Sequence, residues 1–180
     1  SSGFNGIITG QVYAERYYNS SSTYNQHYMG SPVNAPAFTQ FGASGTAGFV
    51  TPTANCDETQ LATGSVYGTV FSYSEANGST CSLAGWKVES ASSGNSTNGK
   101  GYSVLKPGTG TLTLRGNANL NATYSLANLT NSGWSNTTLQ GRPMSSGWPL
   151  VANPYLATLN PSSSTGFDNQ LQVWHTSGAF

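Results

Sequence analysis

The chain has 180 residues and a formal net charge of zero, and only 7% of its residues are charged. Six scattered Lys and Arg residues exclude the clustered positive charge that nucleic acids and anionic membrane surfaces attract, so we expect no nucleic-acid partner. No apolar stretch is long enough to cross a bilayer, so direct membrane insertion is excluded too, and the length fits a single domain over residues 1–180.

Apolar and polar side chains alternate with a period of two along much of the chain, which predicts β-strands. Turn signals such as Asn98-Gly99 separate these segments, and no stretch of ten residues keeps a helical stripe. We therefore predict an all-β, jelly-roll-like β-sandwich of about ten to twelve antiparallel strands with almost no helix. In chain order, the segments with this pattern are 7–18, 66–73, 111–114, 120–126, 148–152 and 170–175.

The two cysteines, Cys56 and Cys81, predict a disulfide if the protein is exported. A metal site would need further ligands, and His27 and His175 are remote in sequence. A bond closing this loop of about 25 residues would stabilise the fold by roughly 3 kcal/mol in the chain-entropy model. Abundant Ser, Thr, Asn and Gly in place of charges favour export. Residues 1–10 carry no signal peptide, which predicts a mature form or an excised domain.

The stretch from Trp148 to Tyr155 reads as the end of a strand followed by a corner. Pro154 cannot donate to a strand ladder, so the strand must end before it. Asn153 can bond its own backbone and start a turn, and Tyr155 can pack its ring back with its hydroxyl near solvent. We interpret this stretch as scaffold.

The same stretch carries a resemblance to a known family. "GWPLVANPY" resembles the "GWNLVGNPYPS" signature of large secreted and surface proteins of Bacteroidota, which the type IX secretion system often exports. Looser similarities follow in order along the chain, including "SPV", "GW", "GKGY" and a final "VW" segment. The residues that match this structural pattern are Pro32, Trp86, Trp148, Asn153, Pro154, Tyr155 and Trp174.

The resemblance implies an extracellular β-sandwich module of an adhesin-like or surface-layer protein, and it carries over no catalytic residue. The chain departs from the pattern at Pro149 and Ala152, and the two cysteines are not part of it. Family members continue past the last strand, so we expect Phe180 to end a fragment, a processed subunit or the ordered part of a longer chain.

The sequence gives little support for catalysis, a metal or a cofactor. A glycosidase needs two facing carboxylates, and the six acidic residues are more simply interpreted as exposed or salt-bridged. No Gly-x-Ser-x-Gly elbow or His-Glu-x-x-His motif occurs. Calcium is the metal to consider, but Asp57-Glu58 and Asp168-Asn169 lack the usual density of acids. We predict no enzyme, no metal and no cofactor.

Aromatic residues offer either a core or a platform for sugars, whose apolar faces stack on flat rings. Trp86 and Trp148 lie in the family pattern and are expected to be buried. The ligand-binding candidates are Trp134, in a polar loop-like context, and Tyr24 and Tyr28. Tyr17 and Tyr18 belong to the same tyrosine-rich region.

Three functions remain open from the sequence. The first is a non-enzymatic surface module that acts in adhesion or as a subunit of a surface assembly or filament, with other copies or neighbouring domains as partners. Its loops or edge strands would make the contacts. The second is a carbohydrate-binding module of a secreted polysaccharide-degrading system, with glycans as partners. The third is a hydrolase, for which no converging groups are visible.

Overall fold

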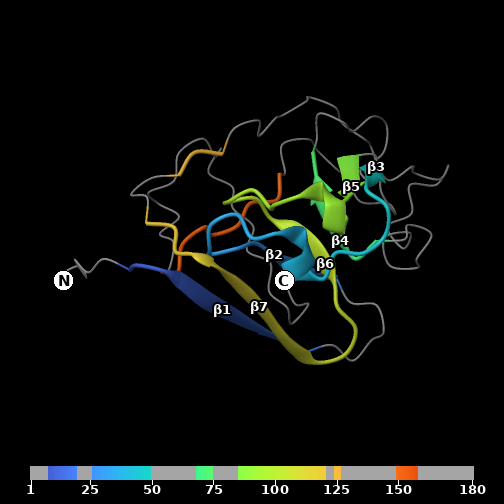
Figure 1. Ribbon diagram of the computed structural model, residues 1–180. Helices are drawn as coiled ribbons and strands as arrows, with labels where there is room; N and C mark the ends of the chain where they lie inside the picture. Colours follow the sequence, from blue (N-terminus) through green and yellow to red (C-terminus); the bar gives the residue numbers. More distant parts are fainter. Residues whose placement is uncertain are drawn as a thin grey trace, which may run out of the picture.

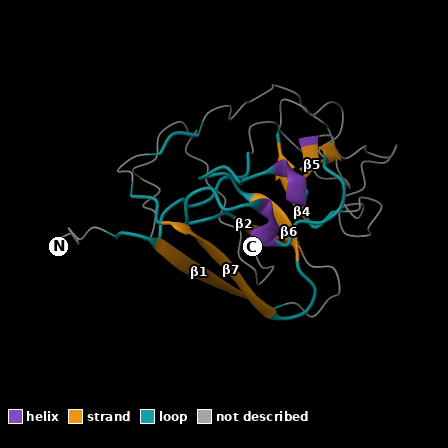
Figure 2. Cartoon of the chain, in the orientation of Figure 1, coloured by secondary structure: helices purple, strands orange, loops and turns teal. Residues whose placement is uncertain are grey.

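The computed structural model describes residues 8–19, 26–49, 68–74, 85–120, 124–126 and 149–157. Within these ranges the chain forms antiparallel β-strands and no α-helix. Two short 3-10 helices lie wholly within these ranges, η1 (Phe38–Phe41) and η4 (Ala91–Ser93). Figures 1 and 2 show this arrangement. The prediction of an all-β protein with almost no helix is confirmed for the described part of the chain.

The described strands form two sheets. The smaller sheet pairs two long strands that are far apart in sequence, β1 (Gln11–Tyr18) and β7 (Gly110–Asn117). The larger sheet has the order β2-β6-β4-β5-β3. Its strands are β2 (Gln26–Met29), β3 (Gly48–Phe49), β4 (Val70–Tyr73), β5 (Trp86–Val88) and β6 (Tyr102–Leu105).

The strand β7 shows the predicted alternation directly. Leu112 and Leu114 are buried, whereas Thr111 and Thr113 are exposed. Antiparallel pairing places Ala14 of β1 opposite Leu114, so the same face of β1 also turns inward. In β7 the inner face is therefore apolar and the outer face polar.

One apolar core joins the two sheets. Leu112 and Leu114 from the small sheet belong to the same buried cluster as Val70 and Val104 from the large sheet. The Tyr102 ring lies at the centre of the aromatic part of this core. The other buried members are Met29, Val33, Phe38 and Phe41, and the ring centroids of Phe38 and Phe41 lie 5.3 and 5.7 Å from that of Tyr102.

The loop region that contains η1 completes the hydrogen bonding of β7 on the side away from β1. The Gln40 side chain donates from Nε2 to the Arg115 carbonyl at 3.1 Å, and its Oε1 accepts from the Arg115 N–H at 2.6 Å. Nearby, the Asn34 N–H donates to the Asn117 carbonyl at 2.8 Å. These side-chain and loop groups stand where a further strand would otherwise pair.

Two predicted strands are wrong where the structure describes them. Leu120 and residues 124–126 lie outside any strand; Tyr124 and Leu126 instead pack against the turn at Gly99, whose φ is +74°. In 149–152, only Val151 forms a bridge, to Lys100. Pro149 has no N–H, which shortens any ladder there. The predicted strand 170–175 lies outside the described residues.

The aromatic part of the core should dominate stability. We expect Phe41→Ala to lower the free energy of unfolding by about 3–5 kcal/mol, because a fully buried ring is lost and a cavity is left. Urea unfolding followed by circular dichroism measures this change. Leu120→Ala is the control, since that side chain is 59% exposed and its loss should cost less than about 0.5 kcal/mol. Equal effects of the two substitutions would contradict the assigned core.

Candidate functional site

The outer face of the small sheet presents two exposed aromatic rings. Tyr13 is 63% exposed and Tyr17 is 66% exposed, and both lie on β1 four residues apart. Because side chains alternate along a strand, the two rings share one face and are separated by about 13 Å. Glu15 lies between them on the same face.

The partner strand β7 completes this face with one cation and two hydroxyl groups. The register places Arg115 opposite Tyr13, Thr113 opposite Glu15 and Thr111 opposite Tyr17. The Arg115 guanidinium carbon lies 5.5 Å from the centroid of the Tyr13 ring, which is a cation–π contact. This contact orients one ring of the pair. We call the set Tyr13, Glu15, Tyr17, Thr111, Thr113 and Arg115 the outer face.

The edge of β1 that faces away from β7 carries backbone groups in a row. Arg115 uses its N–H and C=O on Gln40, so Arg115 and Tyr13 form a non-hydrogen-bonded pair of the ladder. The alternation of antiparallel ladders then directs the N–H and C=O groups of Tyr13, Glu15 and Tyr17 away from β7. Among the described strands, β7 is the only partner of β1.

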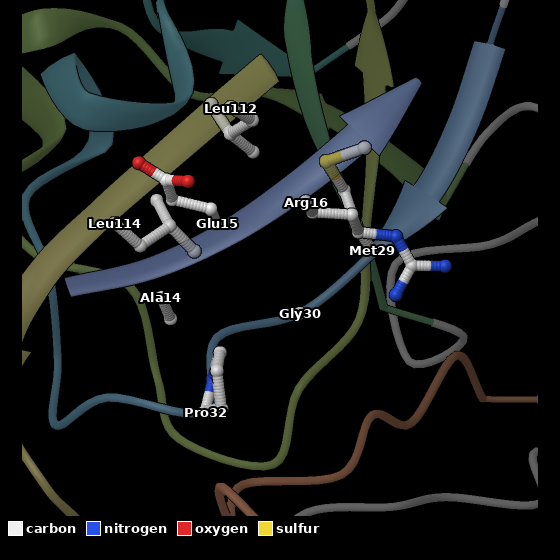
Figure 3. A pocket seen from close by; sticks show the side chains of 8 residues that line it. All are labelled: Ala14, Glu15, Arg16, Met29, Gly30, Pro32, Leu112 and Leu114. Carbon is white, nitrogen blue, oxygen red and sulfur yellow. The ribbon is translucent and has the colours of Figure 1, made fainter. Parts of the chain in front are cut away.

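A hollow lined by both apolar and charged residues lies against the inner side of β1. Figure 3 shows that residues of β1, β2 and β7 and of the segment after β2 surround it. Its volume is about 150 Å³. Glu15 and Arg16 border it along β1. The other lining residues are Ala14, Met29, Gly30, Pro32, Leu112 and Leu114.

His27 packs beside this region in β2. Its side chain is buried, and its ring centroid lies 5.5 Å from that of Tyr18. Among the described residues its Nε2 atom has no hydrogen-bond partner. Burial, and secondarily the positive charge of Arg16, lowers the pKa of His27 below its usual 6.5. The neutral ring is therefore the form that the folded chain favours.

The turn predicted at Asn153-Pro154-Tyr155 is present. The Asn153 Oδ1 atom accepts from the Tyr155 N–H at 3.0 Å, and its Nδ2 donates to the Ala157 carbonyl at 2.6 Å. Pro154 is buried and Tyr155 is half-buried. The hydrogen bonds show the turn itself, and the interpretation of these three residues as scaffold stays a prediction.

The other predicted site residues have mixed outcomes. Tyr28 lies in β2 and is half-buried. Trp86, in the short strand β5, was expected in the core but is half-buried. Its ring packs on Tyr73 of β4, with 5.2 Å between the ring centroids, and lies outside the buried cluster. Pro32 lines the hollow. The remaining predicted residues, which are Cys56, Cys81, Tyr24, Trp134, Trp148 and Trp174, lie outside the described residues.

The carboxylates that the structure describes lie in different environments. Glu89 is buried and accepts a hydrogen bond from the Ser72 hydroxyl at 2.6 Å, and its second oxygen forms a 3.2 Å ion pair with Lys87. Glu15 is exposed on the other sheet. In the described ranges, no three His, Cys, Asp or Glu side chains are grouped as metal ligands, and no helix is long and apolar enough to span a membrane.

The sequence did not single out Tyr13 or the edge of β1. A period-two pattern was visible in this segment, but tyrosine is compatible with either face of a strand because its ring is apolar and its hydroxyl is polar. Only the burial of Leu112 and Leu114 on the paired strand decides that Tyr13 and Tyr17 face outward. That pairing joins segments about a hundred residues apart, beyond the reach of local pattern.

Comparison of the chain with protein-family models, with curated proteins and with solved structures finds no match.

The buried His27 should make stability depend on pH. Because its pKa is lower in the folded than in the unfolded chain, its contribution is fully present above pH 6.5 and is lost as the pH falls through 6.5 toward the folded-state pKa. We expect the melting temperature to decrease on acidification in this range. His27→Leu should flatten the decrease, leaving His175 as the only histidine. An identical pH profile in both proteins would contradict this role.

Proposed function

We propose that this protein is a non-enzymatic extracellular surface module that acts in adhesion or as a structural subunit of a surface assembly. The observation that carries the proposal is the exposed pair Tyr13 and Tyr17 on the outer face of the small sheet. A surface with exposed aromatic rings binds a partner through direct side-chain contacts. The partner on this proposal is another copy or a neighbouring domain of the assembly.

The chemistry of the outer face suits such contacts. Tyrosine offers a large, rigid contact area at low cost in conformational entropy, and Tyr and Arg are enriched among the residues that dominate protein interfaces. Here Arg115 already stacks on Tyr13, so one of the two rings is held in place before a partner arrives. The zero net charge of the chain removes long-range repulsion between copies.

The scaffold on this proposal is a two-layer sandwich of jelly-roll type. The support is the core itself, since Leu112 and Leu114 of the small sheet pack with Val70 and Val104 of the large one. Sheets that share such a core lie face to face in β-sandwiches. An arrangement of this kind leaves the opposite side of each sheet for contacts.

A second candidate function, carbohydrate binding, rests on the same rings. Sugars combine apolar faces, which stack on aromatic rings, with hydroxyl groups, which need nearby hydrogen-bonding partners. The outer face provides Thr111 and Thr113 between and beside the rings, and exposed Gln11 and Asn117 stand opposite each other at its end. A glycan is the ligand on this alternative.

The double substitution Tyr13→Ser with Tyr17→Ser tests both functions. We expect it to weaken the interaction of the outer face at least tenfold, because interface tyrosines commonly contribute more than about 1 kcal/mol each. Self-association is measured by sedimentation velocity, and glycan binding by pull-down on insoluble polysaccharides.

Leu120→Ser serves as the matched control, since it removes an exposed apolar side chain outside the outer face. Loss of self-association alone in the double variant supports the assembly function, and loss of polysaccharide binding alone supports the alternative. If the double variant keeps every interaction that the unmodified chain shows, the proposed role of the outer face is overturned.

A further inference from the structure

We infer that the edge of β1 with which no described strand pairs, together with the hollow beneath it, is an acceptor site for an extended segment of another protein that carries an acidic and an apolar residue two positions apart. This site uses the edge and inner side of β1. It does not depend on the two tyrosine rings of the outer face or on the function proposed for them.

The first support is the row of backbone groups along the edge. The N–H and C=O groups of Tyr13, Glu15 and Tyr17 point away from β7, and no other described strand pairs with β1. An exposed edge of this kind is a template for strand addition, in which main-chain hydrogen bonds supply the affinity. The described loop at Gln40 covers the corresponding edge of β7, so the two edges of the small sheet are treated differently.

The second support is the position and size of the hollow. Ala14 is the inward residue at the middle of β1, and the hollow lies against it with Met29, Leu112 and Leu114. A strand added to β1 would direct every second side chain to this same side. The volume of about 150 Å³ leaves room for one Leu or Phe side chain.

The third support is the charge at the end of the hollow. Arg16 is the next inward-facing residue after Ala14, yet it is exposed and borders the hollow. Glu15 also borders the hollow, but among the described residues the only ion pair is Lys87–Glu89, so Arg16 forms no ion pair there. A carboxylate on the added strand opposite Arg16 would lie on the same face as the apolar residue opposite Ala14, two positions away.

These three features specify the order of residues in the partner. In an antiparallel addition the acidic residue precedes the apolar one, as in Glu-x-Leu, and in a parallel addition the order is reversed. The chain itself contains no such pair, because no Leu, Ile, Val, Met or Phe lies two positions from any of its six acidic residues. Because residues 1–180 hold no such pair, we assign the occupant to another protein and not to a second copy of these residues.

Synthetic peptides provide the direct test. A fluorescein-labelled octapeptide, Thr-Thr-Glu-Thr-Leu-Thr-Val-Thr, is compared by anisotropy with Thr-Thr-Thr-Glu-Leu-Thr-Val-Thr, which has the same composition but places the acid on the opposite face. The reversed order, Thr-Thr-Leu-Thr-Glu-Thr-Val-Thr, tests parallel addition. We expect saturable binding of one in-register peptide below about 1 mM and at least tenfold weaker binding of the face-shifted peptide. No binding of either in-register peptide, or equal binding of the face-shifted one, would overturn the inference.

Variants of the protein test the backbone edge, the hollow and the charge of Arg16 one at a time. Glu15→Pro removes an N–H that points away from β7, so it should abolish binding while the sheet persists, and Glu15→Thr is the control that keeps the N–H. Ala14→Leu fills the hollow and should lower the affinity for the Leu-containing peptide at least tenfold. A peptide with Ala in place of that Leu should recover the affinity. With Arg16→Glu, the protein should prefer a peptide that carries Lys in place of Glu at the position opposite residue 16.

Circular dichroism confirms folding of each variant. Failure of the recovery by the Ala peptide, or of the charge exchange, would overturn the assigned register. The Tyr13→Ser, Tyr17→Ser protein should bind the in-register peptide with an affinity within threefold of that of the unmodified chain. The role proposed for the outer face and the role inferred for the edge are therefore tested by different results. A dimer that forms through the edge and is lost in Glu15→Pro, without peptide binding, would assign the edge to a second copy and overturn the inference.

Discussion

The burial of Leu112 and Leu114 against the larger sheet is the constraint on which the rest of the site depends. Side chains alternate along a strand, so placing these two leucines in the core sends Thr111, Thr113 and Arg115 outward. The antiparallel register then transmits the choice to β1, where Ala14 turns inward and Tyr13 outward. A shift of β7 by one residue would reverse both faces, and two buried side chains thus fix the chemistry of two surfaces.

The edge of β1 follows from the same constraint through a different group of atoms. Gln40 lies in η1, which the aromatic core holds in place through Phe38 and Phe41. Its amide satisfies the N–H and C=O of Arg115, as a neighbouring strand would. The alternation of ladder bonds therefore leaves β1 with outward-facing groups at Tyr13, Glu15 and Tyr17. The core, the loop and the orientation of the backbone groups along β1 are consequences of one packing arrangement.

Local pattern predicted those parts of the structure that local chemistry determines. The alternation of β7 and the turn at Asn153 depend on residues close in sequence, and both are present. The strands β2, β5 and β6 are only three or four residues long, which is too short for a period to be read. The alternation of 120–126 was misleading because Tyr124 and Leu126 pack over the turn at Gly99 and pair with no described strand. The exposed tyrosines and the hollow required long-range pairing, and that information is absent from any short window.

Exposed edges and exposed rings carry a risk of unspecific association, and the placement of charge on β1 addresses it. Glu15 projects on the outer face and Arg16 on the inner one, so any chain that adds to this edge meets an acid on one side and a base on the other. A uniformly apolar segment would have to desolvate both charges without compensation. A segment with a carboxylate facing Arg16 is compensated there, while a cationic one is repelled. The two charges that limit unspecific pairing at this edge are thereby also the groups that make recognition selective.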